Sequence, residues 1–96
     1  MYGIVLVFAG VDEDQYWKVN ELLGIERDGS GDWPEGLRSH TAGRTDDDQL
    51  VVSEVWETKG HQESFMNGRL GAALGEAKLP APIQVIETDL VNHQQR

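Results

Sequence analysis

The alternation of apolar and polar positions in the first quarter of the chain predicts a strand followed by a helix. In the segment Tyr2–Ala9 both alternating sets of side chains are apolar, which is typical of a strand buried on two faces. Asp12 and Gln15 are spaced as a capping box, and Gly24 is suited to end a helix. Between these signals apolar residues recur three and four apart, which predicts a helix to about Leu23 with an apolar face of Tyr16, Val19, Leu22 and Leu23.

The rest of the chain divides into a loop, a hairpin, a second helix and a last strand. Glycine, proline and charged residues make residues 26–36 a loop, and Asp46–Asp48 forms a turn between two strand-like segments. Thr58 is placed to cap the second helix, and Pro80 and Pro82 end it. The expected elements are strands at Leu37–Thr45 and Gln49–Glu57, a helix from about Gly60 to Ala77, and a strand at Ile83–Leu90.

This βαββαβ order is that of the ferredoxin-like α+β fold, in which two helices cover one face of a four-stranded antiparallel sheet. With 96 residues the chain is long enough for one domain, which we place at residues 1–91, followed by a polar tail at residues 92–96. The first and third strands carry apolar side chains on both faces, although the helices can cover only one. We therefore expect a second copy of the chain to cover the other face, giving a homodimer whose sheets form a barrel.

The charge and composition narrow the possible partners. Eight basic and 17 acidic residues give a formal charge of −9, which disfavours nucleic acid and anionic membrane surfaces as partners. The absence of cysteine excludes disulfides and thiolate chemistry, and the three histidines lack metal-ligand spacing, so we expect no metal. No apolar run is long enough to span a membrane, and no signal-peptide pattern is visible, so a cytoplasmic protein is expected.

The hairpin brings together the residues best suited to catalysis. If Asp46–Asp48 is a three-residue loop, His40 lies opposite Glu54 and Arg38 lies opposite Trp56, all on one face of the sheet. His40 could then act as a general base, with Glu54 orienting its ring. The same pair could instead be a structural hydrogen bond across the strands, and a shift of one residue in register would separate it.

Other side chains are candidates for binding a substrate, namely Arg38, Trp56, Phe65 and Tyr16. Three of them also have a structural interpretation: Trp56 as core, Arg38 as a cation stacked on Trp56, and Tyr16 as helix packing. Trp17 is expected to point away from the apolar face of its helix, toward the surface. Trp33 could close over a ligand, but we favour a role in pinning its loop to the dimer.

The hairpin and the second helix resemble a known superfamily. Residues 36–43 (GLRSHTAG) lead into residues 51–58 (VVSEVWET), and Phe65 follows in the helix. A strand that ends in Trp-Glu-Thr, followed by a helix with a Phe, is similar to the pattern of the dimeric α+β barrel superfamily, and within it to the small antibiotic biosynthesis monooxygenase-like proteins. The resemblance implies a homodimer with a pocket between each sheet and its helices.

Several activities are implied by this resemblance, and the fold does not choose among them. They include cofactor-independent oxygenases acting on polycyclic phenols, haem-degrading enzymes and muconolactone-type isomerases. The haem-degrading members carry an Asn on the first strand and a Trp and a His on the second helix. Here that strand has no Asn and the helix positions are Phe65 and Gly75, so haem degradation is set aside.

We therefore expect a cofactor-independent monooxygenase or isomerase acting on a small aromatic or polyketide-like substrate. The alternative is a non-catalytic dimeric module that binds a hydrophobic small molecule.

Overall fold

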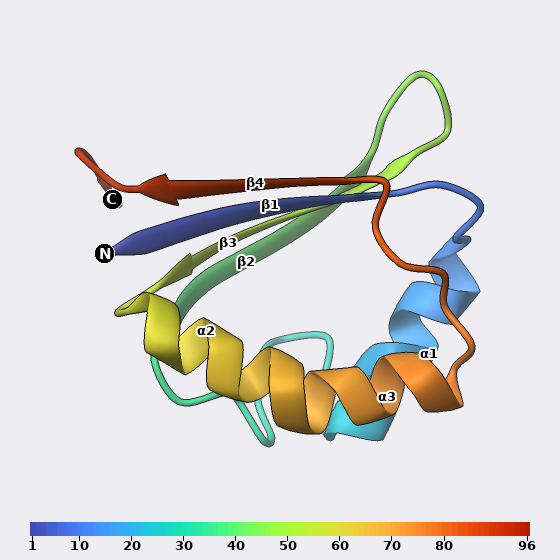
Figure 1. The fold of residues 1–96 in the computed structure, drawn as a ribbon. Helices are drawn as coiled ribbons and strands as arrows, with labels where there is room; N and C mark the ends of the chain where they lie inside the picture. The colour runs from blue at the N-terminus through green and yellow to red at the C-terminus, as the bar shows by residue number, and fades with distance from the viewer.

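The computed structural model describes residues 1–96 as a four-stranded antiparallel sheet with its helices packed on one face (Figure 1). The strand order β2-β3-β1-β4 confirms the predicted ferredoxin-like arrangement. Each predicted strand is present, and its ends lie within one residue of the predicted ones. The elements are β1 (Tyr2–Phe8), α1 (Glu13–Leu23), β2 (Leu37–Arg44), β3 (Leu50–Trp56), α2 (Lys59–Phe65), η1 (Met66–Leu70), α3 (Gly71–Glu76) and β4 (Gln84–Asp89).

The caps of α1 and α2 are those that the sequence predicts. The Asp12 carboxylate accepts from the backbone N–H of Gln15 at 2.8 Å, and the Gln15 side chain accepts from the backbone N–H of Asp12 at 3.0 Å. Gly24 ends α1 in the left-handed conformation, with φ of 75°. The Thr58 hydroxyl accepts from the backbone N–H of His61 at 3.2 Å. These bonds satisfy N–H groups that a helix start otherwise leaves without partners.

The core lies between the sheet and the helices. In β1 every second side chain points inward, and β3 contributes its own alternate set from the neighbouring strand. Trp56 is the one large side chain that is completely buried. The buried apolar residues are Tyr2, Ile4, Leu6, Phe8, Val11, Val19, Leu23, Leu37, Leu50, Val52, Trp56, Phe65 and Ala73.

The second helix differs from its prediction. The sequence predicts an uninterrupted helix, but a π-helical stretch, η1, separates α2 from α3. In this stretch the Gly71 backbone N–H donates to the carbonyl of Met66, five residues earlier. A Cβ at Gly71 would lie only 2.6 Å from that oxygen, so the wide turn depends on a residue without a side chain.

The register of the β2–β3 hairpin is the predicted one over most of its length. The Thr45 N–H donates to the Gln49 carbonyl at 2.9 Å across the turn, and His40 pairs with Glu54. A β-bulge between Leu37 and Ser39 then places Leu37 opposite Trp56.

The prediction that Arg38 faces Trp56 is therefore wrong. Arg38 is the extra residue of the bulge, and its side chain is exposed. It forms an ion pair with Glu57 at 3.5 Å, in which about half of each side chain is exposed. An ion pair this exposed contributes little to stability.

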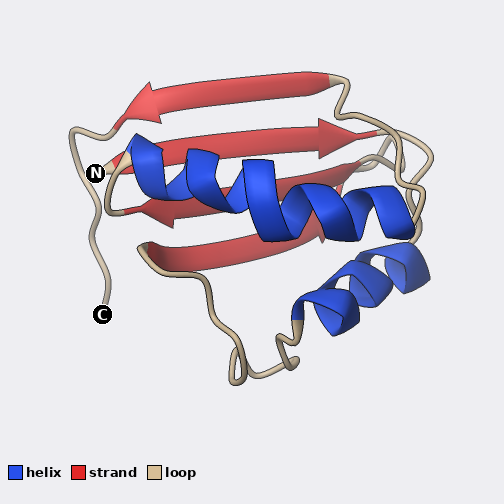
Figure 2. Ribbon diagram, turned by 60° about the horizontal axis from the view of Figure 1, so that its bottom comes forward, coloured by secondary structure: helices blue, strands red, loops and turns tan.

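The face of the sheet away from the helices is open in the single chain, because every helix lies across the opposite face (Figure 2). Apolar side chains of three strands point outward there, since they alternate with the inward set of the core. They are Val5, Val7, Val51, Val55 and Ile86. The edge strand β4 is exposed along its whole length. None of the helices combines the length and the apolar character needed to cross a bilayer.

The loop between α1 and β2 is tied to itself and to its neighbours. Ile25 and Gly31 form an isolated antiparallel bridge, and the Trp33 indole N–H donates to the Leu37 carbonyl at 2.8 Å. Gly31 has φ of 93°, and a Cβ there would lie 2.2 Å from the carbonyl oxygen of Gly24. Only glycine combines this backbone conformation with this approach.

We expect Gly31→Ala to lower the free energy of unfolding by about 1–3 kcal/mol, because the new methyl group meets backbone rather than a movable side chain. Chemical denaturation monitored by tryptophan fluorescence measures the change. Gly43→Ala is the matched control, since a Cβ at Gly43 meets nothing within 4 Å and its φ is not positive. Equal stability of the two variants would contradict the close approach of Gly31 to Gly24.

Candidate functional site

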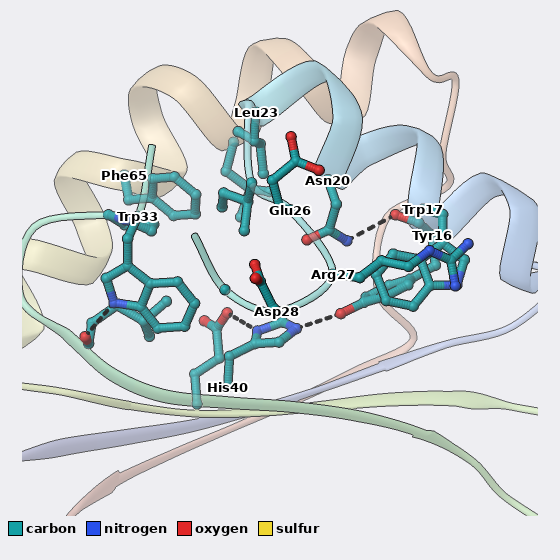
Figure 3. A pocket seen from close by; sticks show the side chains of 16 residues that line it. Tyr16, Trp17, Asn20, Leu23, Glu26, Arg27, Asp28, Trp33, His40 and Phe65 are labelled. Atoms are coloured by element: carbon teal, nitrogen blue, oxygen red, sulfur yellow. Dashed lines mark hydrogen bonds and ion pairs between the residues drawn. The ribbon is translucent and has the colours of Figure 1, made fainter. Parts of the chain in front are cut away.

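A pocket lies between the sheet, α1, the α1–β2 loop and the second helix (Figure 3). Its volume is about 290 Å³, at the small end of small-molecule sites. His40 rises from β2 at the floor, Phe65 and Trp33 stand on one side, and Tyr16, Trp17 and Arg27 stand on the other. The lining residues are Tyr16, Trp17, Asn20, Leu23, Ile25, Glu26, Arg27, Asp28, Gly29, Trp33, Pro34, Leu37, His40, Glu54, Phe65 and Leu70.

The predicted His40–Glu54 pair is formed at the floor of this pocket. His40 Nδ1 lies 2.8 Å from Glu54 Oε2, across the β2–β3 register described above. The Glu54 side chain is 8% exposed and that of His40 is 24% exposed. Because a buried carboxylate needs hydrogen-bond donors, this contact both satisfies Glu54 and fixes the plane of the imidazole.

The second oxygen of Glu54 is also occupied. The Trp56 indole N–H donates to Glu54 Oε1 at 3.1 Å, within the buried core. Trp56 itself is not among the pocket-lining residues, so the prediction that it forms a pocket wall is wrong. Residues two apart in a strand point to the same face of the sheet, so Trp56 lies next to Glu54. Its indole N–H holds the Glu54 carboxylate in place from outside the pocket.

Tyr16 adds a third member to this group. Its hydroxyl oxygen lies 2.6 Å from His40 Nε2, so both ring nitrogens of His40 have a partner. Burial raises the pKa of Tyr16 above its usual value, and the Glu54 carboxylate adds to the rise, although Asn20 opposes it. The sequence places Tyr16 on the inner face of its helix but gives no sign of this contact, which depends on how α1 packs over β2.

The walls of the pocket are largely aromatic. Phe65 lines it as predicted, and Trp33 both lines it and ties its loop to Leu37, at the start of β2 in the same chain. Trp17 was expected at the surface, but it is half-buried in the wall, and the guanidinium carbon of Arg27 lies 4.0 Å from the centroid of its ring. The Trp17 indole N–H is buried without a hydrogen-bond partner, so the wall keeps one unused donor.

Arg69 supports the pocket from outside its lining. From η1 its guanidinium Nη2 donates to the carbonyl of Leu23 at 2.8 Å and to the carbonyl of Asp32 at 2.7 Å. Two elements that border the pocket, the end of α1 and the following loop, are thus held to the second helix by one side chain. No sequence motif signals this role, because the π-helical stretch that places Arg69 was itself not predicted.

Chemically, the site offers a hydrogen-bonded base beside a small aromatic cavity. An imidazole held by a carboxylate is the usual arrangement for removing a proton from a bound molecule. The histidines, aspartates and glutamates form no group of three or more that could hold a metal ion.

The chain matches no protein-family model and no curated protein sequence, whereas its fold matches several solved structures. A proposed antibiotic biosynthesis monooxygenase from Chloroflexus aurantiacus superposes with a TM-score of 0.68 at 14% identity, covering 98% of this chain and 96% of that one. Rv0793 from Mycobacterium tuberculosis gives 0.65 at 15% identity, covering 98% of both chains. NE2512 from Nitrosomonas europaea, a protein of unknown function, gives 0.64 at 16% identity, covering 99% of this chain and 91% of that one.

At sequence identities of 14–16%, the similarity to these structures concerns the fold alone. It extends over nearly the whole of each chain, so no large element is missing or added. The chain therefore has the ferredoxin-like α+β fold of the antibiotic biosynthesis monooxygenase-like proteins, as its hairpin and second helix indicated.

Proposed function

We propose that this protein is a cytoplasmic, cofactor-independent enzyme that removes a proton from a small aromatic or polyketide-like substrate and lets the resulting anion react with dioxygen. The observation that supports this most strongly is the hydrogen-bonded Glu54–His40–Tyr16 group at the floor of the aromatic pocket. In this proposal His40 is the general base and Glu54 orients it. Phe65 and Tyr16 belong to the substrate-binding wall.

Charges around the pocket favour a substrate that is neutral before it reacts. Glu26, Asp28 and Glu54 line the cavity, against a single guanidinium from Arg27. A substrate with a permanent negative charge would be repelled by the three carboxylates, whereas a neutral ring system packs on the aromatic walls at no such cost. The negative charge that forms after proton removal lies beside the protonated His40, which stabilises it.

The reaction balances without another reductant. A ring CH₂ group that is acidified by a carbonyl conjugated with it gives one proton to the base, and the carbanion forms a C–O bond to O₂, which gives a peroxide anion. Loss of the second C–H proton breaks the O–O bond and leaves a carbonyl, and the departing oxygen is released as water, so that CH₂ and O₂ become C=O and H₂O. Carbon is oxidised, dioxygen is reduced, and His40 returns its proton to the water that leaves.

Anthrone, a tricyclic ketone with such a CH₂ group, is a suitable probe. We expect His40→Gln to lower kcat for oxygen uptake with anthrone by about 10²-fold or more, because the base is lost while the side chain remains polar. An oxygen electrode together with the absorbance of the quinone product measures the rate. His93→Gln, in the tail, is the matched control and should leave kcat unchanged.

The alternative, a non-catalytic binding module, predicts a different pattern. In that case anthrone quenches the fluorescence of Trp17 and Trp33 in the pocket wall, but oxygen uptake does not exceed that of buffer in any variant. Full activity in the His40→Gln variant would instead show that another group removes the proton.

We also propose that the protein works as a homodimer formed through the open face of the sheet. The outward apolar side chains include Val5, Val51, Val55 and Ile86, and Ile86 is 44% exposed in the single chain. An antiparallel sheet with one face in water normally alternates apolar and polar positions, whereas β1 is apolar on both faces. A second copy would supply a covering surface of the same kind, with two-fold symmetry.

Native mass spectrometry at low micromolar concentration should show twice the mass of one chain. We expect Ile86→Lys to shift the protein to the monomer, because a charged side chain at a buried interface remains without a partner. Glu76→Lys is the control, because it also places a lysine on the surface, at the exposed end of α3 and away from that face. This variant should remain a dimer. A monomeric wild-type protein would overturn this part of the proposal.

A further inference from the structure

We propose that Tyr16, rather than the ring of His40, is the group that meets the substrate, and that it passes the substrate's proton on to His40. This inference rests on the proposed function and adds a catalytic residue to it. The three side chains then form a chain from Glu54 through His40 to Tyr16, all of which line the pocket, and the phenolic oxygen of Tyr16 points into it toward His40 (Figure 3).

The hydrogen-bond partners of Glu54 determine which nitrogen of His40 carries a proton. An ionised carboxylate can only accept, and both Glu54 oxygens do so, from Trp56 Nε1–H and from His40 Nδ1. The proton of a neutral His40 ring therefore lies on Nδ1, which leaves the lone pair of Nε2 as an acceptor. The Tyr16 hydroxyl, 2.6 Å away, donates to it.

This bond occupies the only basic position of the ring. Nε2 has a single lone pair, so a substrate cannot hydrogen-bond to it while Tyr16 is in place. The Tyr16 oxygen, in contrast, still has lone pairs available, and Tyr16 lines the pocket. A substrate proton therefore reaches His40 by way of the phenolic oxygen.

The step balances in atoms and charge. The substrate C–H or O–H bond breaks and its proton bonds to the Tyr16 oxygen, while the original Tyr16 proton moves to His40 Nε2. The products are a substrate anion, a neutral Tyr16 and an imidazolium paired with Glu54. Burial raises the pKa of Tyr16 and so disfavours a free tyrosinate, which favours a step in which the phenolic oxygen gains one proton as it gives up the other.

The decisive variant is Tyr16→Phe, which keeps the ring and removes the hydroxyl. If Tyr16 relays the proton, kcat with anthrone falls by about 10²-fold or more, as in His40→Gln. If His40 acts directly, the same change uncovers Nε2, and kcat stays level or rises. Tyr2→Phe is the matched control, because the Tyr2 hydroxyl bonds to Glu87 of the edge strand β4 and neither residue lines the pocket. Thermal unfolding of each variant shows whether the fold is kept.

A second measurement does not depend on the probe being turned over. In protein labelled with ¹⁵N-histidine, NMR at neutral pH should show His40 with a proton on Nδ1 only, and Tyr16→Phe should shift the Nε2 signal more than the Nδ1 signal. A proton on Nε2 in the wild-type protein would overturn the relay. Loss of activity in His40→Gln with full activity in Tyr16→Phe would also overturn it, but would leave His40 as the base. Full activity in both variants would overturn the relay and show that another group removes the proton, whereas oxygen uptake no faster than in buffer, in the wild-type protein as well, would overturn the proposed function itself.

Discussion

The burial of Glu54 is the constraint on which the pocket floor depends. A carboxylate in the core of a chain this small is tolerated only if donors surround it. Trp56 supplies one donor from the same strand and His40 supplies the other from the neighbouring strand. Because the hairpin register brings His40 opposite Glu54, the turn at Asp46–Asp48 also determines the chemistry of the floor.

The arrangement above the floor follows from helix packing. Tyr16 reaches His40 only because α1 lies over β2, and the direction of α1 is fixed by its caps and by the Arg69 side chain that binds its last turn. The pocket thus has a rigid base on adjacent strands and walls that come from segments far apart in the sequence. Sites built on strands and helices hold their geometry more closely than sites built on loops alone.

Much of the fold could be predicted from the sequence because its signals are local. The capping box at Asp12 and the strand alternation in β1 each depend on a few neighbouring residues. The pairing of His40 with Glu54 was within reach because a three-residue turn sets the register. The Arg38 bulge and the π-helical stretch could not be predicted in this way, because each inserts one residue at a position that depends on tertiary packing. The Tyr16–His40 contact needs the crossing of a helix over a strand, which no local pattern encodes.

The wide turn at Gly71 has a consequence for attempts to make the protein more heat-resistant. Replacing helical glycines by alanine is a standard stabilising change, because it reduces the conformational freedom of the unfolded chain. Gly68 and Gly75 have open space for the added methyl group, but Gly71 does not. An alanine there would force the turn toward ordinary α-helical geometry and rotate Arg69 and Phe65 relative to α3. A substitution chosen only for helix propensity would therefore change the shape of the pocket.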